Sequence, residues 1–396
     1  MTDSPRLARR LDHIEPFYVM ECAKTAERIA RSADCDPAQG GRPMIFLNIG
    51  EPDFTAPPPV LAAAHRSLDA GRTQYTSATG LPALREAIAL WYGERFGVEV
   101  APARILDTAG ATAALQLVTL ALFEPGDEVL MPDPCYPCNR HFVAATGATA
   151  TLLRSDAAAR FQLDAASVRA AWNTHTRGVL LASPSNPTGT SIDHAEMRRI
   201  VEAVRERGGV TIVDEIYLGL SYDERYGHTA LDFGDDVISI NSFSKYFSMT
   251  GWRLGWAVLP EALVAPVEKL AQNLYICPSS VAQHAALACF GPDAIVEYER
   301  RRAEFRRRRD SIVPALNALG LTVPVVPDGA FYAWADCSAH AAGSWDFCFD
   351  MMERAHVALT PGRDFGRAET EHFFRLSFAS SMAHLEEAVQ RLRAAL

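Results

Sequence analysis

Val210-Thr-Ile-Val213 and Val237-Ile-Ser-Ile240 are two short apolar runs, each followed directly by polar residues. Their length and their β-branched content predict buried strands. The same pattern occurs at 128–131, 149–153 and 178–182, with helical periodicity between the runs at 111–123, 136–146 and 193–207. This alternation predicts an α/β fold with a mostly parallel sheet that is flanked by helices. Ligands of such sheets bind at the carboxyl ends of the strands.

The pattern changes near Ile295, where a long charged helix and mixed elements follow. We therefore predict three parts: an N-terminal arm (1–45) that contributes to a small domain, a large domain (46–290), and a C-terminal small domain of α+β type (291–396). Residues 44–49 are expected to form a strand that enters the large domain. The basic cluster Arg300–Arg309 is interpreted as a solvated helix surface, with a polyanion site as the alternative.

Composition excludes several classes of protein. A formal net charge of −10 argues against a general nucleic-acid binder. No apolar run reaches the roughly 18 residues of a membrane span, so we expect a cytoplasmic protein without a membrane partner. Cys135 and Cys138 form a single Cys-x-x-Cys, and no second pair or histidine spacing accompanies it. We therefore predict no metal site, and packing cysteines rather than a redox pair, which stays the alternative.

Lysine is rare in this chain. Among 38 lysines and arginines, only Lys24, Lys245 and Lys269 are lysines. Lys245 follows the strand that ends near Ile240, and Ser242, Ser244 and Arg253 lie close by in sequence. Hydroxyls and a guanidinium bind anions such as phosphate. A lysine amine beside a phosphate site is what a Schiff-base cofactor requires; the alternative is an ordinary surface lysine.

Polar residues also follow the two preceding predicted strands. Asp214 follows the apolar run 210–213, where a carboxylate needs a partner. A protonated pyridine nitrogen would serve, and a metal ion or a helix cap are the alternatives. Ser183-Pro-Ser-Asn-Pro-Thr-Gly189 predicts a rigid turn that presents Asn186.

Together these motifs resemble the class I and II aminotransferases, which are fold-type I enzymes that depend on pyridoxal phosphate. The resemblance extends from Leu47-Asn-Ile-Gly-Glu-Pro-Asp-Phe54 to Arg375-Leu-Ser-Phe-Ala379. Asn186, Asp214, Lys245 and Arg253 occur in the family's order. The resemblance implies a large domain built on a seven-stranded sheet, and pyridoxal 5'-phosphate as the cofactor.

The resemblance also implies a role for each matching residue. Lys245 would form the Schiff base and move the proton, Asp214 would pair with the pyridine nitrogen, and Arg375 would bind the substrate carboxylate. The remaining expected cofactor contacts are Gly110, Ala111, Thr112, Tyr136, Asn186, Tyr217, Ser242, Arg253 and, from the second subunit of a homodimer, Tyr75. Asn186 and the backbone at Gly50 would assist Arg375.

The implied activity is a ping-pong transfer of an amino group from an L-amino acid to a 2-oxo acid, with 2-oxoglutarate expected as the acceptor. Carbon–sulfur lyases and aminocyclopropane-carboxylate synthases resemble the same pattern and stay as alternatives; a non-enzymatic sensor domain is a remote third. Some aspartate-using relatives carry a lysine where Thr112 stands, and the arm segment Phe17-Tyr-Val-Met20 is apolar. These two features favour neutral or aromatic amino donors. The family often has a tyrosine near Asn139, and its loss is expected to reshape the pocket.

Overall fold

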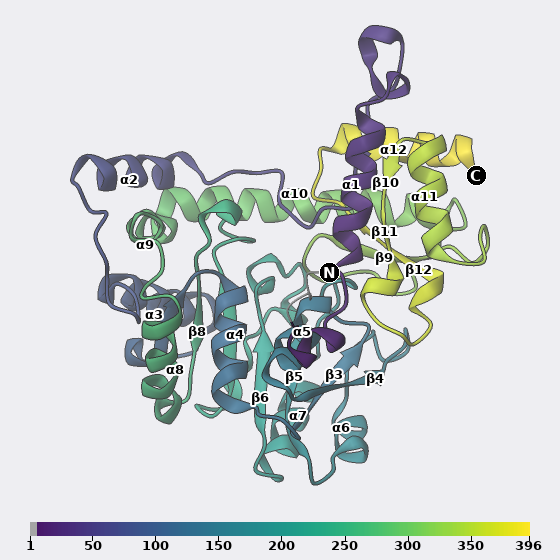
Figure 1. The fold of residues 1–396 in the computed structure, drawn as a ribbon. Helices are drawn as coiled ribbons and strands as arrows, with labels where there is room; N and C mark the ends of the chain where they lie inside the picture. Colours follow the sequence, from purple (N-terminus) through teal and green to yellow (C-terminus); the bar gives the residue numbers. More distant parts are fainter. Residues whose placement is uncertain (1–5) are drawn as a thin grey trace.

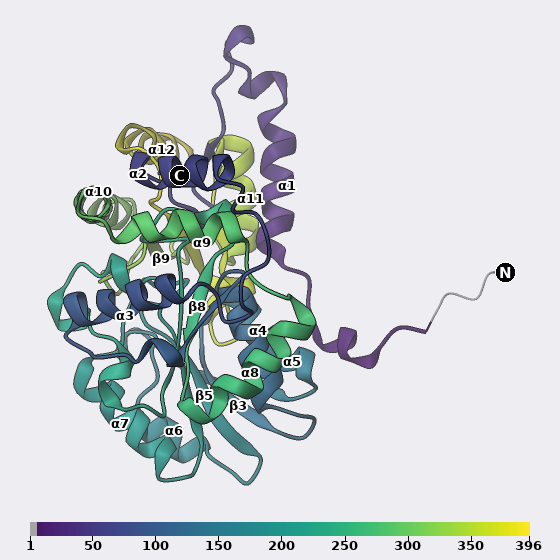
Figure 2. The ribbon, with the colours of Figure 1, turned by 90° about the vertical axis from the view of Figure 1, so that its left-hand side faces the viewer.

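The computed structural model describes residues 6–396 and contains one large sheet and a smaller body of strands and helices (Figure 1). The first five residues of the predicted arm lie outside the described residues. The short 3-10 helix Arg9–His13, which precedes the first long helix, lies beside α5 (Pro137–Thr146) (Figure 2). Among the described residues, no helix is both long enough and apolar enough to cross a membrane.

The large sheet has seven strands in the order β2-β8-β7-β6-β5-β3-β4. Only β8 runs antiparallel to its neighbours, so the predicted, mostly parallel sheet is confirmed. Its strands are β2 (Ile105–Thr108), β3 (Glu128–Asp133), β4 (Thr149–Arg154), β5 (Thr176–Ala182), β6 (Val210–Asp214), β7 (Ile238–Ser242) and β8 (Gly255–Val258). The sequence patterns did not indicate β2 and β8. Each has only four residues, and a central aspartate or an initial glycine interrupts its apolar pattern.

Helices cover both faces of this sheet because its strands are apolar on both sides. On β5, Leu180 packs toward one cluster of buried residues, whereas Val179 and Leu181 pack toward another. The first cluster includes residues of α4 (Ala111–Leu122), α5 (Pro137–Thr146) and α8 (Glu261–Leu274). The second includes residues of α6 (Ala165–Ala171) and α7 (His194–Arg205). Near β8, α3 (Pro82–Phe96) belongs to a third cluster of buried residues, which includes Trp256 and Val258 of that strand. α2 (Pro58–Asp69) packs against α9 (Ser280–Ala286).

The smaller body joins segments from both ends of the chain. Its elements are α1 (Tyr18–Ala30), β1 (Ile45–Phe46), β9 (Tyr332–Asp336), α11 (Ser344–Arg354), β10 (Val357–Ala358), β11 (Thr360–Pro361), β12 (Phe373–Ser377) and α12 (Met382–Ala395). Residues 44–49 were expected to form a strand that enters the large domain, but the strand that forms belongs to the smaller body. Only Ile45 and Phe46 form a strand there, and it pairs in parallel with β10. Nothing in the local pattern of an apolar segment specifies which sheet it joins.

The arginine-rich segment lies within α10 (Pro292–Asn317), a helix that runs from α9 across the molecule to the smaller body (Figure 1). The helix prediction is confirmed, but its surface is only partly solvated. Arg301 and Arg308 are buried, whereas Arg300 and Arg307 keep about 60% of their side-chain surface exposed, at 61% and 60%. Some arginines of this helix are therefore buried, whereas others are exposed to solvent.

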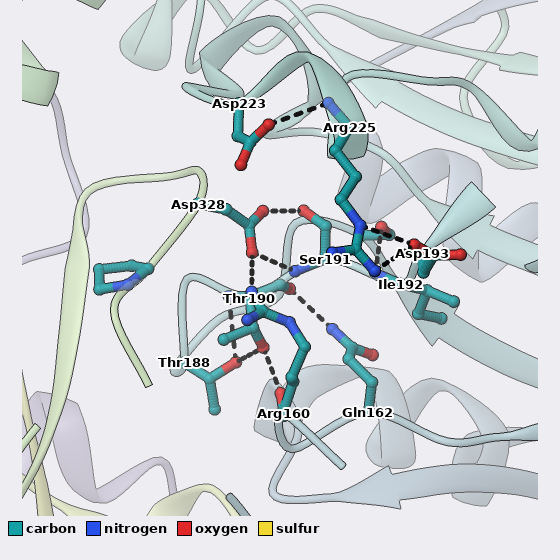
Figure 3. A network of polar contacts seen from close by, with 12 residues as sticks. Arg160, Gln162, Thr188, Thr190, Ser191, Ile192, Asp193, Asp223, Arg225 and Asp328 are labelled. Carbon is teal, nitrogen blue, oxygen red and sulfur yellow. Dashed lines mark hydrogen bonds and ion pairs between the residues drawn. The ribbon is translucent and has the colours of Figure 1, made fainter. Parts of the chain in front are cut away.

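A polar network fixes the turn after β5 against the segment that leads into β9 (Figure 3). Its centre is Asp328, whose buried carboxylate accepts hydrogen bonds from the Ser191 amide (3.0 Å), the Ser191 hydroxyl and Arg160. The amides of Asp328 and Gly329 both donate to the Gly189 carbonyl, at 3.0 Å each. Gly189 has a φ of +67°, and a Cβ there would lie 2.5 Å from Pro327, so glycine is required. The network thereby holds the predicted Asn186 turn beside the start of β9.

We expect Asp328→Ala to lower the free energy of unfolding by about 3 kcal/mol, because two donors on Ser191 and the Arg160 guanidinium lose a buried acceptor. Urea unfolding followed by circular dichroism measures this. Asp223 is exposed and accepts only a local turn amide, that of Arg225, so Asp223→Ala is the matched control and should change stability by less than about 1 kcal/mol. Equal losses in the two variants would contradict the central role of Asp328.

Candidate active site

A cavity of about 940 Å³ lies at the carboxyl ends of β5, β6 and β7. It is bounded by the ends of these strands, by the first turn of α4, and by residues of α1 and β12. Eleven of the thirteen residues predicted for the site line this cavity: Gly50, Ala111, Thr112, Tyr136, Asn186, Asp214, Tyr217, Ser242, Lys245, Arg253 and Arg375. Segments that are far apart in the sequence are therefore brought together where the strand pattern predicted.

Lys245 lies just beyond β7 and lines the cavity. Its amine donates a hydrogen bond to the Gly50 carbonyl at 2.6 Å and lies 5.6 Å from the centre of the Tyr217 ring. Desolvation by the surrounding protein, with the nearby positive charge of Arg375, lowers the pKa of Lys245 to about 8. An amine with such a pKa is largely protonated at neutral pH but keeps a substantial neutral fraction, which is the form that acts as nucleophile or base.

Asp214 is the last residue of β6 and is 5% exposed. Burial raises the pKa of this carboxyl group to about 6, although the Ile216 amide (3.3 Å) and the Asn139 side chain donate hydrogen bonds to it. The charged form of a buried carboxylate is stabilised most strongly by a cationic partner. Asn139 therefore contacts Asp214 directly.

The opposite end of the cavity is built to bind an anion. Arg253 and Thr112 are exposed there, and Ser242 and Ser244 form a linked pair in which the Ser244 amide donates to the Ser242 hydroxyl at 3.1 Å. α4 begins at Ala111, and the amides of Ala113 and Ala114 donate to the Gly110 carbonyl. The amides of Ala111 and Thr112 have no acceptor within the helix and can donate to an anion.

Gly110 does not line the cavity, but it decides how closely Arg253 approaches. It has a φ of +86°, and a Cβ there would lie 2.7 Å from the Arg253 guanidinium. Only glycine therefore combines this backbone conformation with this contact.

Arg375 on β12 is 2% exposed and lines the cavity. Its guanidinium donates to the Asn186 side chain at 2.9 Å and to the Asn48 carbonyl at 2.6 Å. It also lies 4.5 Å from the centre of the Tyr332 ring. A guanidinium fixed in this way, with one nitrogen unpaired, suits bidentate binding of a carboxylate.

Three tyrosines line the cavity. The hydroxyls of Tyr217 and Tyr332 are 2.7 Å apart, and burial raises the pKa of Tyr217 and of Tyr136 well above the ordinary range. All three therefore stay neutral hydrogen-bonding groups at physiological pH. Tyr75, in contrast, is 79% exposed and does not line this cavity, so its expected role in a second subunit stays a prediction.

Sequence analysis missed several residues of the site. Tyr332, Asn48 and Glu51 line the cavity, and Tyr332 packs so closely on Gly50 that a Cβ at Gly50 would lie 2.4 Å from its hydroxyl. Asn48 and Glu51 lie within the quoted segment 47–54 but were assigned no role, and no local signal distinguishes Tyr332. The predicted pair Cys135 and Cys138 consists of free thiols, and the described residues contain no cluster of three or more metal-ligating side chains.

The donor set fits pyridoxal phosphate. The cavity offers an amine for the aldehyde, a buried carboxylate for the ring nitrogen, and hydroxyl, guanidinium and helix amide donors for the phosphate. Asp214 is buried, whereas Thr112 and Arg253 among the phosphate donors are exposed, which fits a ligand with an aromatic ring and a dianionic tail.

Comparison with known proteins agrees with this chemistry. Residues 42–392 match the family model described as aminotransferase class I and II. The chain is 36% identical to a valine–pyruvate aminotransferase of Mycobacterium tuberculosis over 99% of this chain and 98% of that one. It is 35% identical to an aspartate aminotransferase of Rhizobium meliloti, over 98% of this chain and 96% of the other.

Solved structures give the same result. A crystal structure of an aminotransferase from Mycobacterium tuberculosis has a TM-score of 0.93 at 36% identity, and 99% of each chain is covered. The aspartate aminotransferase of Thermus thermophilus with maleate has a TM-score of 0.91 at 30% identity, covering 99% of this chain and all of that one. The chain therefore belongs to the class I and II aminotransferases, a family of fold-type I transaminases that use pyridoxal 5'-phosphate.

Proposed function

We propose that this aminotransferase moves the amino group of a neutral or aromatic L-amino acid to a 2-oxo acid, with 2-oxoglutarate as the first acceptor to test, by a ping-pong mechanism. The observation that carries the proposal is the presence of Lys245, Asp214 and Arg375 in one cavity. These three groups can provide a base, a counter-ion for the cofactor ring and an anchor for the substrate carboxylate.

Each residue has a defined task in this proposal. Arg375, steadied by Asn186 and the Asn48 carbonyl, binds the substrate carboxylate and thereby orients the Cα–H bond. Lys245, whose amine lies against the Gly50 carbonyl, would remove the α-proton and hold it for its return.

The remaining residues hold the cofactor. When bound, pyridoxal phosphate supplies the electron sink, and Asp214 keeps its ring nitrogen protonated. Tyr217 and Asn186 would donate hydrogen bonds to its phenolic oxygen, and Tyr136 would stack on the ring. Its phosphate would lie between Ser242, Ser244, Arg253 and the first turn of α4.

The proposed donor class rests on the side chains that line the rest of the cavity. Most of these are apolar: Phe17, Val19, Met20, Ala23, Ile49, Leu115 and Phe142. The remaining charged side chains of the lining, Glu27 and Glu51, are both acidic and would repel a second carboxylate on the donor. The relative named for valine and pyruvate supports a neutral donor, and those named for aspartate define the competing candidate.

We further propose that the working unit is a cytoplasmic homodimer. The exposed Tyr75, together with the apolar Leu274 and Ile276, gives this chain a surface that a second copy could cover. Tyr75 would then reach the cofactor phosphate of the neighbouring subunit. All eight cysteines are free, as is usual for a reducing compartment.

The pKa of Lys245 leads to a first prediction. We expect the rate at which cofactor-free protein captures pyridoxal phosphate to rise with pH through about 8 and then level off, because only the neutral amine attacks the aldehyde. Stopped-flow absorbance measures the rate, and Lys269→Arg should match the wild type. A midpoint near the ordinary lysine value of about 10.4 would show that Lys245 is not the reacting group.

Donor selectivity leads to a second prediction. With 2-oxoglutarate or pyruvate as acceptor, kcat/KM for valine or phenylalanine should exceed that for aspartate by at least about tenfold, since a carboxylate side chain meets apolar and acidic groups. Amino-acid analysis of the products also distinguishes transfer from elimination. A preference for aspartate, or release of ammonia without an acceptor, refutes this part of the proposal.

Substrate anchoring leads to a third prediction. Arg375→Lys should raise the KM of the amino donor by about 100-fold while the cofactor stays bound, because an ammonium cannot form the bidentate pair. Steady-state kinetics and the absorbance of the bound cofactor provide the two readouts. An unchanged KM would remove Arg375 from the substrate site.

A further inference from the structure

Four arginines of α10 lie on two different faces of the helix. Arg300 and Arg307 are exposed and pair with Glu297 and Glu304, one turn earlier on the same helix. Arg301 and Arg308 are buried and reach out of the helix to residues 53–55. We call residues 50–55 the 50–55 loop.

Arg308 is held at three positions of its guanidinium. Its two terminal nitrogens donate to the two carboxylate oxygens of Asp53, at 2.8 and 2.9 Å, and its Nε donates to Glu304 at 3.0 Å. The side chain of Arg308 is 5% exposed and that of Asp53 is 28% exposed. This is a bidentate pair with restricted geometry, unlike the solvated pairs on the other face of the helix.

Two further contacts fix the same end of the loop. Arg301 donates to the Thr55 carbonyl at 2.6 Å. The Phe54 ring lies between the two buried guanidiniums, 5.0 Å from that of Arg301 and 5.2 Å from that of Arg308, and meets Phe305 edge-on. Helix positions 301, 305 and 308 share one face of α10. This face of the helix therefore contacts three consecutive residues of the loop, 53–55.

The other end of the loop lies in the active site. The Gly50 carbonyl accepts the hydrogen bond from Lys245, Glu51 accepts one from Thr250, and Tyr332 packs on the Gly50 Cα. Only Glu51 and the buried Pro52 separate Gly50 from Asp53. A displacement at Asp53 is therefore transmitted to the Gly50 carbonyl and to the substrate-facing backbone beside it.

We propose that Arg308 and Asp53 are positioning residues, whose bidentate ion pair fixes the 50–55 loop so that the Gly50 carbonyl meets the amine of Lys245. The pair touches neither substrate nor cofactor and acts through the loop. The inference rests on the role assigned to Lys245 above, and it gives the buried arginines of α10 a function in the reaction.

A lysine at position 308 is the sharpest test, because it keeps the charge but loses the planar fork. The charged groups that influence the Lys245 amine are Arg375, Glu51, Arg253 and Asp214. Among these, Glu51 belongs to the loop, and the Gly50 carbonyl also favours the protonated amine. A loosened loop weakens both, so the pKa of Lys245 should fall.

The experiment compares Arg308→Lys and Asp53→Asn with Arg307→Lys, the same change at an exposed position. Cofactor-free full-length protein is mixed with pyridoxal phosphate across a pH range, and steady-state kinetics are measured on the reloaded enzyme. We expect Arg308→Lys and Asp53→Asn to lower the midpoint of the capture rate by about 0.5 pH unit and kcat by about tenfold. The double variant should lose no more than either single variant, since the two residues share one interaction. Arg307→Lys should match the wild type.

A lower melting temperature with an unchanged midpoint and unchanged kcat would make the pair merely structural and overturn the proposal, as would equal effects of Arg307→Lys. If one of the two test variants does not fold, the other decides. Failure of the wild type itself to capture pyridoxal phosphate with a midpoint near pH 8 would instead refute the assignment of Lys245, so the two failures are distinguishable.

Discussion

The hydrogen bond between the Lys245 amine and the Gly50 carbonyl joins the two halves of this active site. Lys245 follows β7 of the large sheet, whereas Gly50 follows β1, which pairs with β10 of the smaller body. For the two atoms to meet at 2.6 Å, the sheet, the smaller body and the loop between them must all be fixed relative to one another. The contacts between the large sheet, the smaller body and this loop maintain the hydrogen bond between Lys245 and Gly50.

Two sets of polar contacts provide that fixation. Asp328 ties the turn that carries Asn186 to the segment before β9, which carries Tyr332. Arg308 ties the 50–55 loop to α10. Both sets pair a carboxylate with a guanidinium, an arrangement that has a demanding geometry and therefore specifies one relative position. Apolar packing alone tolerates small displacements more readily.

Much of the large sheet was predictable because its information is local. The apolar composition of runs such as 210–213 and 237–240 is enough to predict buried strands. Lys245 could be identified because only three lysines occur in the chain. The residues that were missed depend on long-range contacts. Tyr332 acquires its place only by pairing across the cavity with Tyr217, and residues 45–46 join β10 through a partner more than three hundred residues away. The pattern of Arg300–Arg309 predicted a helix, but which arginines are buried depends on the loop that packs against them.

The central claim is that Lys245 is the residue that binds the cofactor, and the three lysines of the chain make it directly testable. Borohydride reduction of the protein loaded with pyridoxal phosphate, followed by proteolysis and mass spectrometry, identifies the modified lysine. The account predicts one stoichiometric modification, at Lys245, with Lys24 and Lys269 unmodified. Stoichiometric modification of Lys24 or Lys269, with Lys245 unmodified, would contradict it.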